Sequence, residues 1–158
     1  MLLKNKLLMK IAIASDHAGF AYKKILLNEL KEQYDILDLG TDSEKPTDYP
    51  DHAEDIANSI LKGEVERGVL ICGSGVGVSV AANKFKGIRA GVCHDTYSAH
   101  QSVEHDDANV LCIGERVVGI ELAREIIFTF LKAKFSREPR HQKRLDKILA
   151  IENKNMKG

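Results

Sequence analysis

Residues 68–77 read GVLIC followed by GSGVG, so a short apolar run ends at Cys72 and passes directly into alternating glycines. The run Gly68–Cys72 is typical of a buried strand, and the glycines indicate a tight turn into the small-residue segment that follows. Four more short segments are rich in β-branched residues and are each followed by a turn or glycine signal, which predicts strands at Lys10–Ser15, Ile36–Leu39, Ile88–Cys93 and Asn109–Ile113.

The segments between these strands have a helical period. Apolar residues recur at intervals of three and four in three places: Leu26, Leu27, Leu30 and Tyr34; Ala53, Ile56, Ala57, Ile60 and Leu61; and Ile120, Ala123, Ile127, Phe130 and Leu131. Strands that alternate with helices pair in parallel through right-handed crossovers. The predicted fold class is therefore α/β, with a single doubly wound, Rossmann-like domain whose five-stranded parallel sheet carries helices on both faces.

Length and charge disfavour several classes of protein. A chain of 158 residues, 44% hydrophobic and 29% charged, has the size of one globular domain. Its 23 Lys and Arg balance 23 Asp and Glu, and it has no Trp, so nucleic acid is not an expected partner. No apolar run is long enough to span a membrane, and 3 cysteines without a signal peptide are typical of free thiols in the cytoplasm.

The two ends of the chain stand apart from this pattern. Residues 1–8 are interpreted as an N-terminal extension and residues 9–158 as the domain, and either Met1 or Met9 could be the natural start. The segment Arg137–Asn153 is helical in composition and follows the completed sheet, so its apolar residues need another surface. It is also strongly basic. It is either a solvated charged face or a helix that reaches over a partner subunit and presents cations to an anion.

Polar and glycine residues follow three of the predicted strands. Open parallel sheets bind ligands beyond the carboxyl ends of their strands, where Asp16 and His17, the loop Gly73–Gly77, and Gly114–Arg116 would meet. The loop leads into a helix and is either an anion cradle of backbone N–H groups or only a tight turn. Its glycine spacing and its position in the chain do not fit a dinucleotide-binding fingerprint, and it lacks the Gly-Lys-Ser/Thr of a P-loop.

Cys72 is the most reactive residue that this edge offers. It precedes the loop, where nearby donors favour a thiolate, whereas Cys93 and Cys112 lie within strands and are expected to be inert. No His/Asn arrangement of a cysteine hydrolase accompanies Cys72, so a general base is preferred over a nucleophile. His100 and His105 are five positions apart, about 140° around a helix, so they are not expected to share a metal.

Several motifs together resemble the B-type ribose-5-phosphate isomerases and their relatives, the allose-6-phosphate and galactose-6-phosphate isomerases. The matching segments run in order from Met9 almost to the end of the chain: SDHAGF at 15–20, TDYP at 47–50, ICGSGVG at 71–77, AANK at 81–84, GIR at 87–89, EH at 104–105 with ANV at 108–110, GERVVG at 114–119 and RHQKR at 140–144.

This resemblance implies an aldose–ketose isomerase that interconverts D-ribose 5-phosphate and D-ribulose 5-phosphate in the pentose phosphate pathway, without a metal or cofactor. Cys72 would be the base that moves a proton between C2 and C1. The loop residues Gly73, Ser74, Gly75, Val76 and Gly77 would hold the enediolate oxygens. His105 matches the family's acid for opening the sugar ring, and Asp16 would assist it.

The resemblance also implies a phosphate site and a partner. His17, Arg116, Arg140 and Arg144 match the family's phosphate contacts, His141 lies between the last two, and Tyr49 lines the pocket. Asp106 stands at a substrate contact where relatives usually have asparagine. In the family the C-terminal basic helix serves the neighbouring subunit, so the resemblance implies a homodimer with composite active sites, or a tetramer built from it.

Two alternatives stay open at this point. The substrate could be allose 6-phosphate or galactose 6-phosphate. The galactose enzyme combines two kinds of subunit, one of which lacks the histidine that matches His105, so the presence of His105 favours ribose. A second alternative is a non-catalytic sugar-phosphate or nucleotide-binding module, which would bind its ligand without exchanging the C2 proton.

Overall fold

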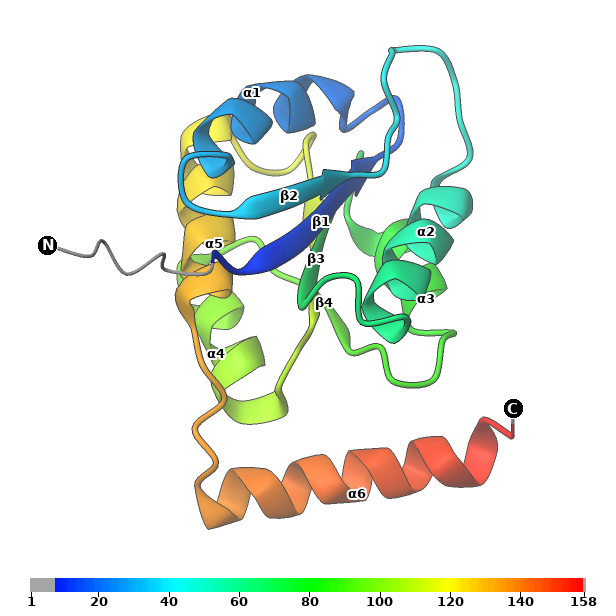
Figure 1. The fold of residues 1–158 in the computed structure, drawn as a ribbon, viewed down its shortest axis with the longest axis vertical. Helices are drawn as coiled ribbons and strands as arrows, with labels where there is room; N and C mark the ends of the chain where they lie inside the picture. The colour runs from blue at the N-terminus through cyan, green and yellow to red at the C-terminus, as the bar shows by residue number, and fades with distance from the viewer. Residues whose placement is uncertain (1–7, 158) are drawn as a thin grey trace, which may run out of the picture.

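The structure, a computed structural model drawn in Figure 1, describes residues 8–157. The predicted N-terminal extension lies outside the described residues, apart from the exposed Leu8. The elements follow one another as β1 (Lys10–Ser15), α1 (Phe20–Leu30), β2 (Asp35–Asp38), α2 (Tyr49–Leu61), β3 (Arg67–Cys72), α3 (Val76–Ala82), β4 (Ala90–Val92), α4 (Thr96–Asp106), β5 (Val110–Gly114), α5 (Ile120–Lys132) and α6 (Pro139–Asn155).

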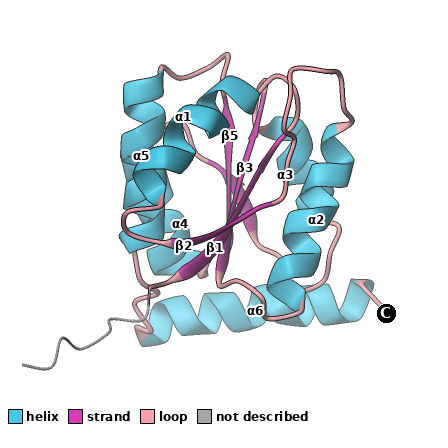
Figure 2. Ribbon diagram, turned by 45° about the horizontal axis from the view of Figure 1, so that its top comes forward, coloured by secondary structure: helices cyan, strands magenta, loops and turns pink. Residues whose placement is uncertain are grey.

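The strands form one 5-stranded sheet in the order β2-β1-β3-β5-β4, and every neighbouring pair is parallel. Helices α1, α4 and α5 cover one face, while α2 and α3 cover the other, as Figure 2 shows. Because alternate side chains of a strand point to opposite faces, Ile11 and Ile13 of β1 enter the first core and Ala12 and Ala14 enter the second. The predicted α/β fold with helices on both faces is confirmed.

The strand β4 is shorter than the predicted Ile88–Cys93. The N–H of Ile88 donates to the carbonyl of Phe85 in a turn, and the N–H of Arg89 donates to the side chain of Asn109. These bonds withdraw both N–H groups from a strand ladder, so pairing with β5 starts only at Ala90. The edge of the sheet is therefore a strand of 3 residues.

The helix α6 crosses beneath the amino ends of the strands (Figures 1 and 2). It is fixed to the domain by the buried His141 and Leu145, and the carboxylate of Glu152 accepts the N–H of Gly87 at 2.8 Å. Further along, Ile148 and Ile151 are 41% and 64% exposed. The apolar stripe of this helix is thus covered only in part by its own chain. Among residues 8–157, no helix has the length and apolarity needed to cross a membrane.

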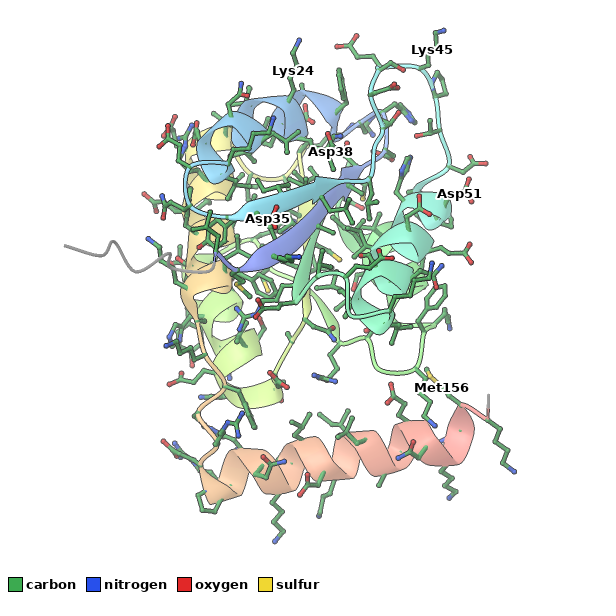
Figure 3. All side chains as sticks on the ribbon, viewed as in Figure 1. Lys24, Asp35, Asp38, Lys45, Asp51 and Met156 are labelled. Carbon is green, nitrogen blue, oxygen red and sulfur yellow. The ribbon has the colours of Figure 1, made fainter. Side chains whose placement is uncertain are left out.

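Charged side chains keep to the outside of the domain, as Figure 3 shows for Lys24, Lys45 and Asp51. Two charged residues depart from this pattern: Asp16 is 7% exposed, and Lys23 is 2% exposed and reaches Asp38 at the end of β2, with 2.5 Å between Nζ and Oδ1. The same Oδ1 accepts the N–H of Gly40. A buried ammonium needs such a partner, and here it fixes the start of the segment that leads from β2 to α2.

The largest apolar contributor to the first core is Phe130 of α5, which is fully buried. We expect Phe130→Ala to lower the free energy of unfolding by about 3–5 kcal/mol, because the substitution removes buried apolar surface and leaves a cavity. Val80→Ala, at a side chain that is 57% exposed, should change the free energy of unfolding by less than about 0.5 kcal/mol. Urea denaturation of both variants tests this, and equal losses would contradict the packing described.

Candidate active site

A cleft of about 440 Å³ opens at the carboxyl ends of β1 and β3. Its lining brings together residues from four separate parts of the chain, three of which the sequence predicted to meet at the ends of strands: Asp16, His17, Ala18, Tyr49, Cys72, Gly73, Ser74, Gly77, Arg116 and Val117. Two hollows of about 500 and 510 Å³ lie elsewhere, beside Tyr34, and their linings include neither cysteine nor histidine. Compared with these two hollows, the cleft is the one that holds a cysteine and a histidine.

Cys72 ends β3 and is 4% exposed. Its Sγ accepts the backbone N–H of Gly75, with 3.0 Å between N and S. This bond requires the loop to turn back on the sulfur, and Gly75 does so with φ +79°, in the left-handed region that favours glycine. This N–H is a hydrogen-bond donor aimed directly at the sulfur, from the residue that precedes α3. Of the loop N–H groups expected to face substrate, this one serves the cysteine instead.

The end of β5 holds the other side of the loop. The N–H groups of Glu115 and Arg116 donate to the carbonyls of Cys72 and Gly73 at 2.9 and 3.0 Å. Gly114 lies so close to the loop that a Cβ there would come within 2.6 Å of the carbonyl carbon of Ser74. The backbone around Cys72 is therefore fixed from two directions, which is the rigidity that a preorganised catalytic group needs.

Two side chains frame the loop from above. The ring of Tyr49 and the guanidinium of Arg116 lie over Gly77 and Gly73, where a Cβ would approach them within 2.8 and 3.2 Å. Arg116 is exposed and carries its charge to the mouth of the cleft. Glycines at these positions thus leave the space that both side chains occupy.

The turn after β1 supplies Asp16 and His17. The Oδ1 of Asp16 accepts the N–H groups of Ala18 and Gly19 at 2.9 and 3.1 Å, and its Oδ2 takes no part in these bonds. The Nδ1 of His17 accepts the N–H of Thr47 at 3.2 Å. A nitrogen that accepts carries no proton, so a neutral His17 has its proton on Nε2.

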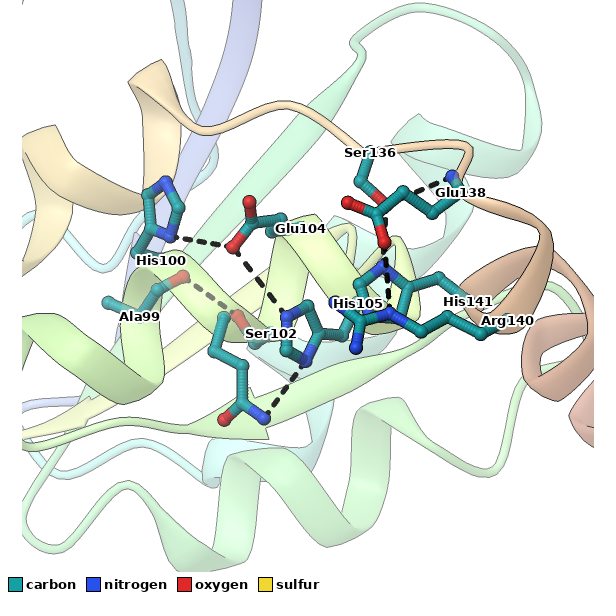
Figure 4. A network of polar contacts seen from close by, with 10 residues as sticks. Ala99, His100, Ser102, Glu104, His105, Ser136, Glu138, Arg140 and His141 are labelled. Atoms are coloured by element: carbon teal, nitrogen blue, oxygen red, sulfur yellow. Dashed lines mark hydrogen bonds and ion pairs between the residues drawn. The ribbon is translucent and has the colours of Figure 1, made fainter.

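The other predicted site residues gather elsewhere, where the end of α4 meets the start of α6 (Figure 4). The rings of His105 and His141 stack with 4.0 Å between their centroids. His105 Nδ1 lies 3.1 Å from the Nε2 of Gln101, and His141 Nδ1 lies 2.6 Å from the hydroxyl of Ser136. The exposed residues Asp106, Arg140 and Arg144 belong to the same junction.

This second cluster lies at the amino ends of the strands, whereas Cys72 lies at the carboxyl end of β3. The helix α4 starts after the carboxyl end of β4 and returns to the amino end of β5, so His105, in its last turn, reaches the amino edge that α6 crosses (Figure 2). One chain therefore does not bring His105 and Asp106 to Cys72. The crossover topology predicted from the sequence already implies that Cys72 and His105 lie at opposite ends of the strands. The motif resemblance alone does not reveal this.

The remaining cysteines and the orienting residues complete the site. Burial raises the pKa of Cys93 and raises that of Cys112 well above the ordinary value of 9.0, in line with the inert role expected for both.

Thr47, His52 and Ser136, which orient the histidines, were not predicted as site residues. Thr47 could have been suspected from its place in the motif TDYP, and Ser136 from its closeness to Arg140 in the sequence. Within residues 8–157, no three His, Cys, Asp or Glu side chains are grouped to hold a metal ion.

Comparison with known proteins identifies the family of this chain. The sequence profile of a family described as Ribose/Galactose Isomerase matches residues 11–148. Ribose-5-phosphate isomerase B of Escherichia coli is 49% identical, over 92% of this chain and 97% of that protein. The chain belongs to the ribose/galactose isomerase family.

Members of this family share the fold described above and are enzymes of the isomerase class. A solved structure of ribose-5-phosphate isomerase B from Clostridium thermocellum superposes with a TM-score of 0.90 at 48% identity, covering 94% of this chain and 100% of that one. D-erythrulose-4-phosphate isomerase 2 of Mycolicibacterium smegmatis is 42% identical, over 91% of this chain and 97% of that protein. The resemblance drawn from the motifs is thereby confirmed, and the family contains proteins named for more than one sugar phosphate.

The stacked pair predicts a pH dependence of stability. Burial lowers the pKa of His141 below its ordinary value of 6.5, and the nearby His105 and Arg140 lower it further. Between this lowered pKa and 6.5, the unfolded chain binds a proton that the folded chain does not. The free energy of unfolding should therefore fall as the pH drops through this window.

Two measurements check this expectation. An NMR titration of the His141 ring should give a midpoint below 6.5. Urea denaturation from about pH 7.5 down to about pH 5 should show a steeper loss of stability in the native protein than in His141→Asn, which cannot titrate. A His141 midpoint at or above 6.5 would contradict the burial of this ring beside cationic neighbours.

Proposed function

We propose that this protein interconverts D-ribose 5-phosphate and D-ribulose 5-phosphate, with Cys72 as the base. The observation that carries the proposal is the Cys72 sulfur beside the N–H of Gly75, at the edge of a cleft that also holds His17 and Arg116. A thiolate beside cationic or hydrogen-bonding side chains is suited to removing a proton next to the carbonyl of a phosphorylated sugar.

The reaction moves two protons. The Cys72 thiolate takes the proton from C2 of the open-chain aldose, the electron pair forms the C1=C2 bond, and the charge develops on O1. The enediolate then gains a proton on O1 and loses the proton on O2. Its C2–O2 bond becomes the new carbonyl, and the Cys72 thiol returns its proton to C1. The Ser74 hydroxyl and the backbone N–H groups of Gly73, Ser74 and Gly77 are the donors that would stabilise both oxygens, since the N–H groups of Gly75 and Val76 already donate to Cys72 and Ser74.

Ring opening needs an acid at the ring oxygen and an acceptor for the O1 proton. Asp16 supports the second role, because its Oδ1 is held by two N–H groups while Oδ2 takes no part in those bonds. His105 is proposed for the first role. Since the two residues lie at opposite edges of one sheet, this step calls for His105 from a second copy of the chain.

We therefore propose a homodimer with composite active sites. In each site, one chain supplies Cys72 and the cleft, and its partner supplies the cluster of His105, Asp106, Arg140, His141 and Arg144. Two features support this arrangement: the cluster faces away from the chain's own cleft, and Ile148 and Ile151 of α6 are exposed beside it. His17 and Arg116 of one chain, with Arg140 and Arg144 of the partner, would hold the phosphate, which carries about two negative charges.

The assay is the conversion of ribose 5-phosphate to ribulose 5-phosphate by the purified protein. We expect Cys72→Ala to lower kcat by about 10²- to 10⁴-fold, because it removes the base. Cys93→Ala is the matched control, since that thiol is also 4% exposed but lies outside the cleft. Equal activity of Cys72→Ala and the native protein would overturn the proposed mechanism.

The same assay separates the alternative substrates. The name of the similar protein from Escherichia coli favours ribose 5-phosphate as the best substrate. Allose 6-phosphate, galactose 6-phosphate and erythrulose 4-phosphate serve as comparisons. The highest kcat/KM is expected for ribose 5-phosphate. Binding of sugar phosphates without exchange of the C2 proton would instead support a non-catalytic module.

Mixing two inactive variants tests the composite site. Cys72→Ala and His105→Ala, unfolded together and refolded in equal amounts, should recover about a quarter of the native activity, because half of the dimers are mixed and each mixed dimer has one intact site. The control mixes Cys72→Ala with the double variant Cys72→Ala/His105→Ala, which has no intact combination. No recovery in the first mixture would mean that both residues act within one chain or that no shared site forms.

A further inference from the structure

We propose that His52 is a positioning residue, which acts through Thr47 to hold His17 in the cleft as a hydrogen-bond donor with its proton on Nε2. The inference rests on the proposed function, in which His17 contacts the substrate phosphate. His52 does not line the cleft, and none of the matching motifs includes it.

Three contacts connect the residues. The Nε2 of His52 lies 2.9 Å from the Oγ1 of Thr47, and the backbone N–H of Thr47 donates to the Nδ1 of His17 at 3.2 Å. His52 lies in the second turn of α2 and is only 9% exposed, so its ring has little freedom to turn. The side chain of Thr47 is thus bound to a residue of α2, while its backbone N–H binds a residue of the cleft.

The segment that carries Thr47 depends on this contact. Between β2 and α2 the chain runs outward as an exposed loop, the projecting loop near the label of Lys45 in Figure 3. At its start the loop is fixed to β1, because Gly40 and Thr41 exchange backbone bonds of 2.8 Å with Ser15. At its end, His52 holds the Thr47 side chain beside the first turn of α2. Without His52, the N–H that meets His17 would lose that support.

The position of this N–H decides the chemistry of His17. Neutral imidazole has one donor and one acceptor nitrogen, and the partner of one nitrogen fixes the role of the other. Because Nδ1 accepts from Thr47, the donor Nε2–H is the group left for a ligand in the cleft. An anionic phosphate oxygen accepts hydrogen bonds and cannot donate one, so only this tautomer suits it.

The other nitrogen of His52 argues against a role in packing alone. Within residues 8–157, its Nδ1 is buried and has no hydrogen-bond partner. A buried polar atom without a partner destabilises the fold, and an apolar ring of similar size would fill the same space without that penalty. The imidazole is therefore explained by what its Nε2 does for Thr47.

Kinetics of matched variants test the proposal. His52→Phe keeps a ring but removes the contact, whereas His52→Gln keeps an amide that can reach Thr47. Thr47→Val and Thr47→Ser form the same pair on the other side of the contact. Ser43→Ala is the control on the same loop, because within the part of the chain that the structure describes its hydroxyl bonds only to the nearby N–H of Lys45.

We expect His52→Phe and Thr47→Val to raise the KM for ribose 5-phosphate and the inhibition constant of inorganic phosphate by about five- to tenfold. Their kcat should stay within about twofold of the native value, because the phosphate is bound equally before and during the reaction. His52→Gln, Thr47→Ser and Ser43→Ala should stay within about twofold on all three constants.

A spectroscopic measurement reports His17 directly. In protein with ¹⁵N-labelled histidine, long-range ¹⁵N–¹H spectra distinguish the protonated ring nitrogen from the bare one. The native protein should show His17 protonated at Nε2, and His52→Phe should show a mixture of both tautomers.

The proposal is overturned if His52→Phe leaves KM and the His17 spectrum at their native values, even if its melting temperature falls, since that combination would show a purely structural role. It is also overturned if kcat alone decreases. Should the native protein lack isomerase activity, the proposed function fails, but phosphate binding and the tautomer of His17 still decide this inference.

Discussion

The hydrogen bond from the backbone N–H of Gly75 to the sulfur of Cys72 is the contact on which the site depends. It places a donor 3.0 Å from the one cysteine that lines the cleft, and it exists only because Gly75 takes a left-handed conformation. The sheet order makes this turn possible. With β3 between β1 and β5, the loop after Cys72 is flanked by the turn that carries Asp16 and by the end of β5. The parallel sheet thereby brings the turn after β1, the loop after β3 and the end of β5 together along one side of the cleft.

The same topology divides the candidate residues between two edges. Helices that return from one edge of a parallel sheet carry their last turns to the other edge, so His105 lies with the cations of α6 rather than with Cys72. A single chain has the proposed base and oxyanion donors on one side, and a pair of stacked imidazoles with two arginines on the other. In the homodimer proposed above both groups of residues would be used, because the cluster of each chain would complete the cleft of its partner.

Much of this arrangement could be predicted from the sequence. Apolar runs such as GVLIC and the helical periods between them specify a parallel sheet, because only strands covered on both faces lack a polar side. The start of β4 was harder to predict, since Ile88 and Arg89 donate to Phe85 and Asn109 instead of joining the ladder, and no local pattern reveals these partners. The contacts among His17, Thr47 and His52 join parts of the chain up to about thirty residues apart, and such contacts become visible only in three dimensions.

The central claim is that Cys72 carries a proton between two carbons, and labelling in D₂O tests it most directly. The protein converts ribose 5-phosphate in D₂O while NMR follows the product. If Cys72 takes the C2 proton and exchanges it with solvent before returning it, the ribulose 5-phosphate formed should carry deuterium at C1, and Cys72→Ala should form labelled product at least about 100-fold more slowly. Rapid conversion with no deuterium at C1 in the native protein, together with equal conversion by Cys72→Ala, would contradict the account.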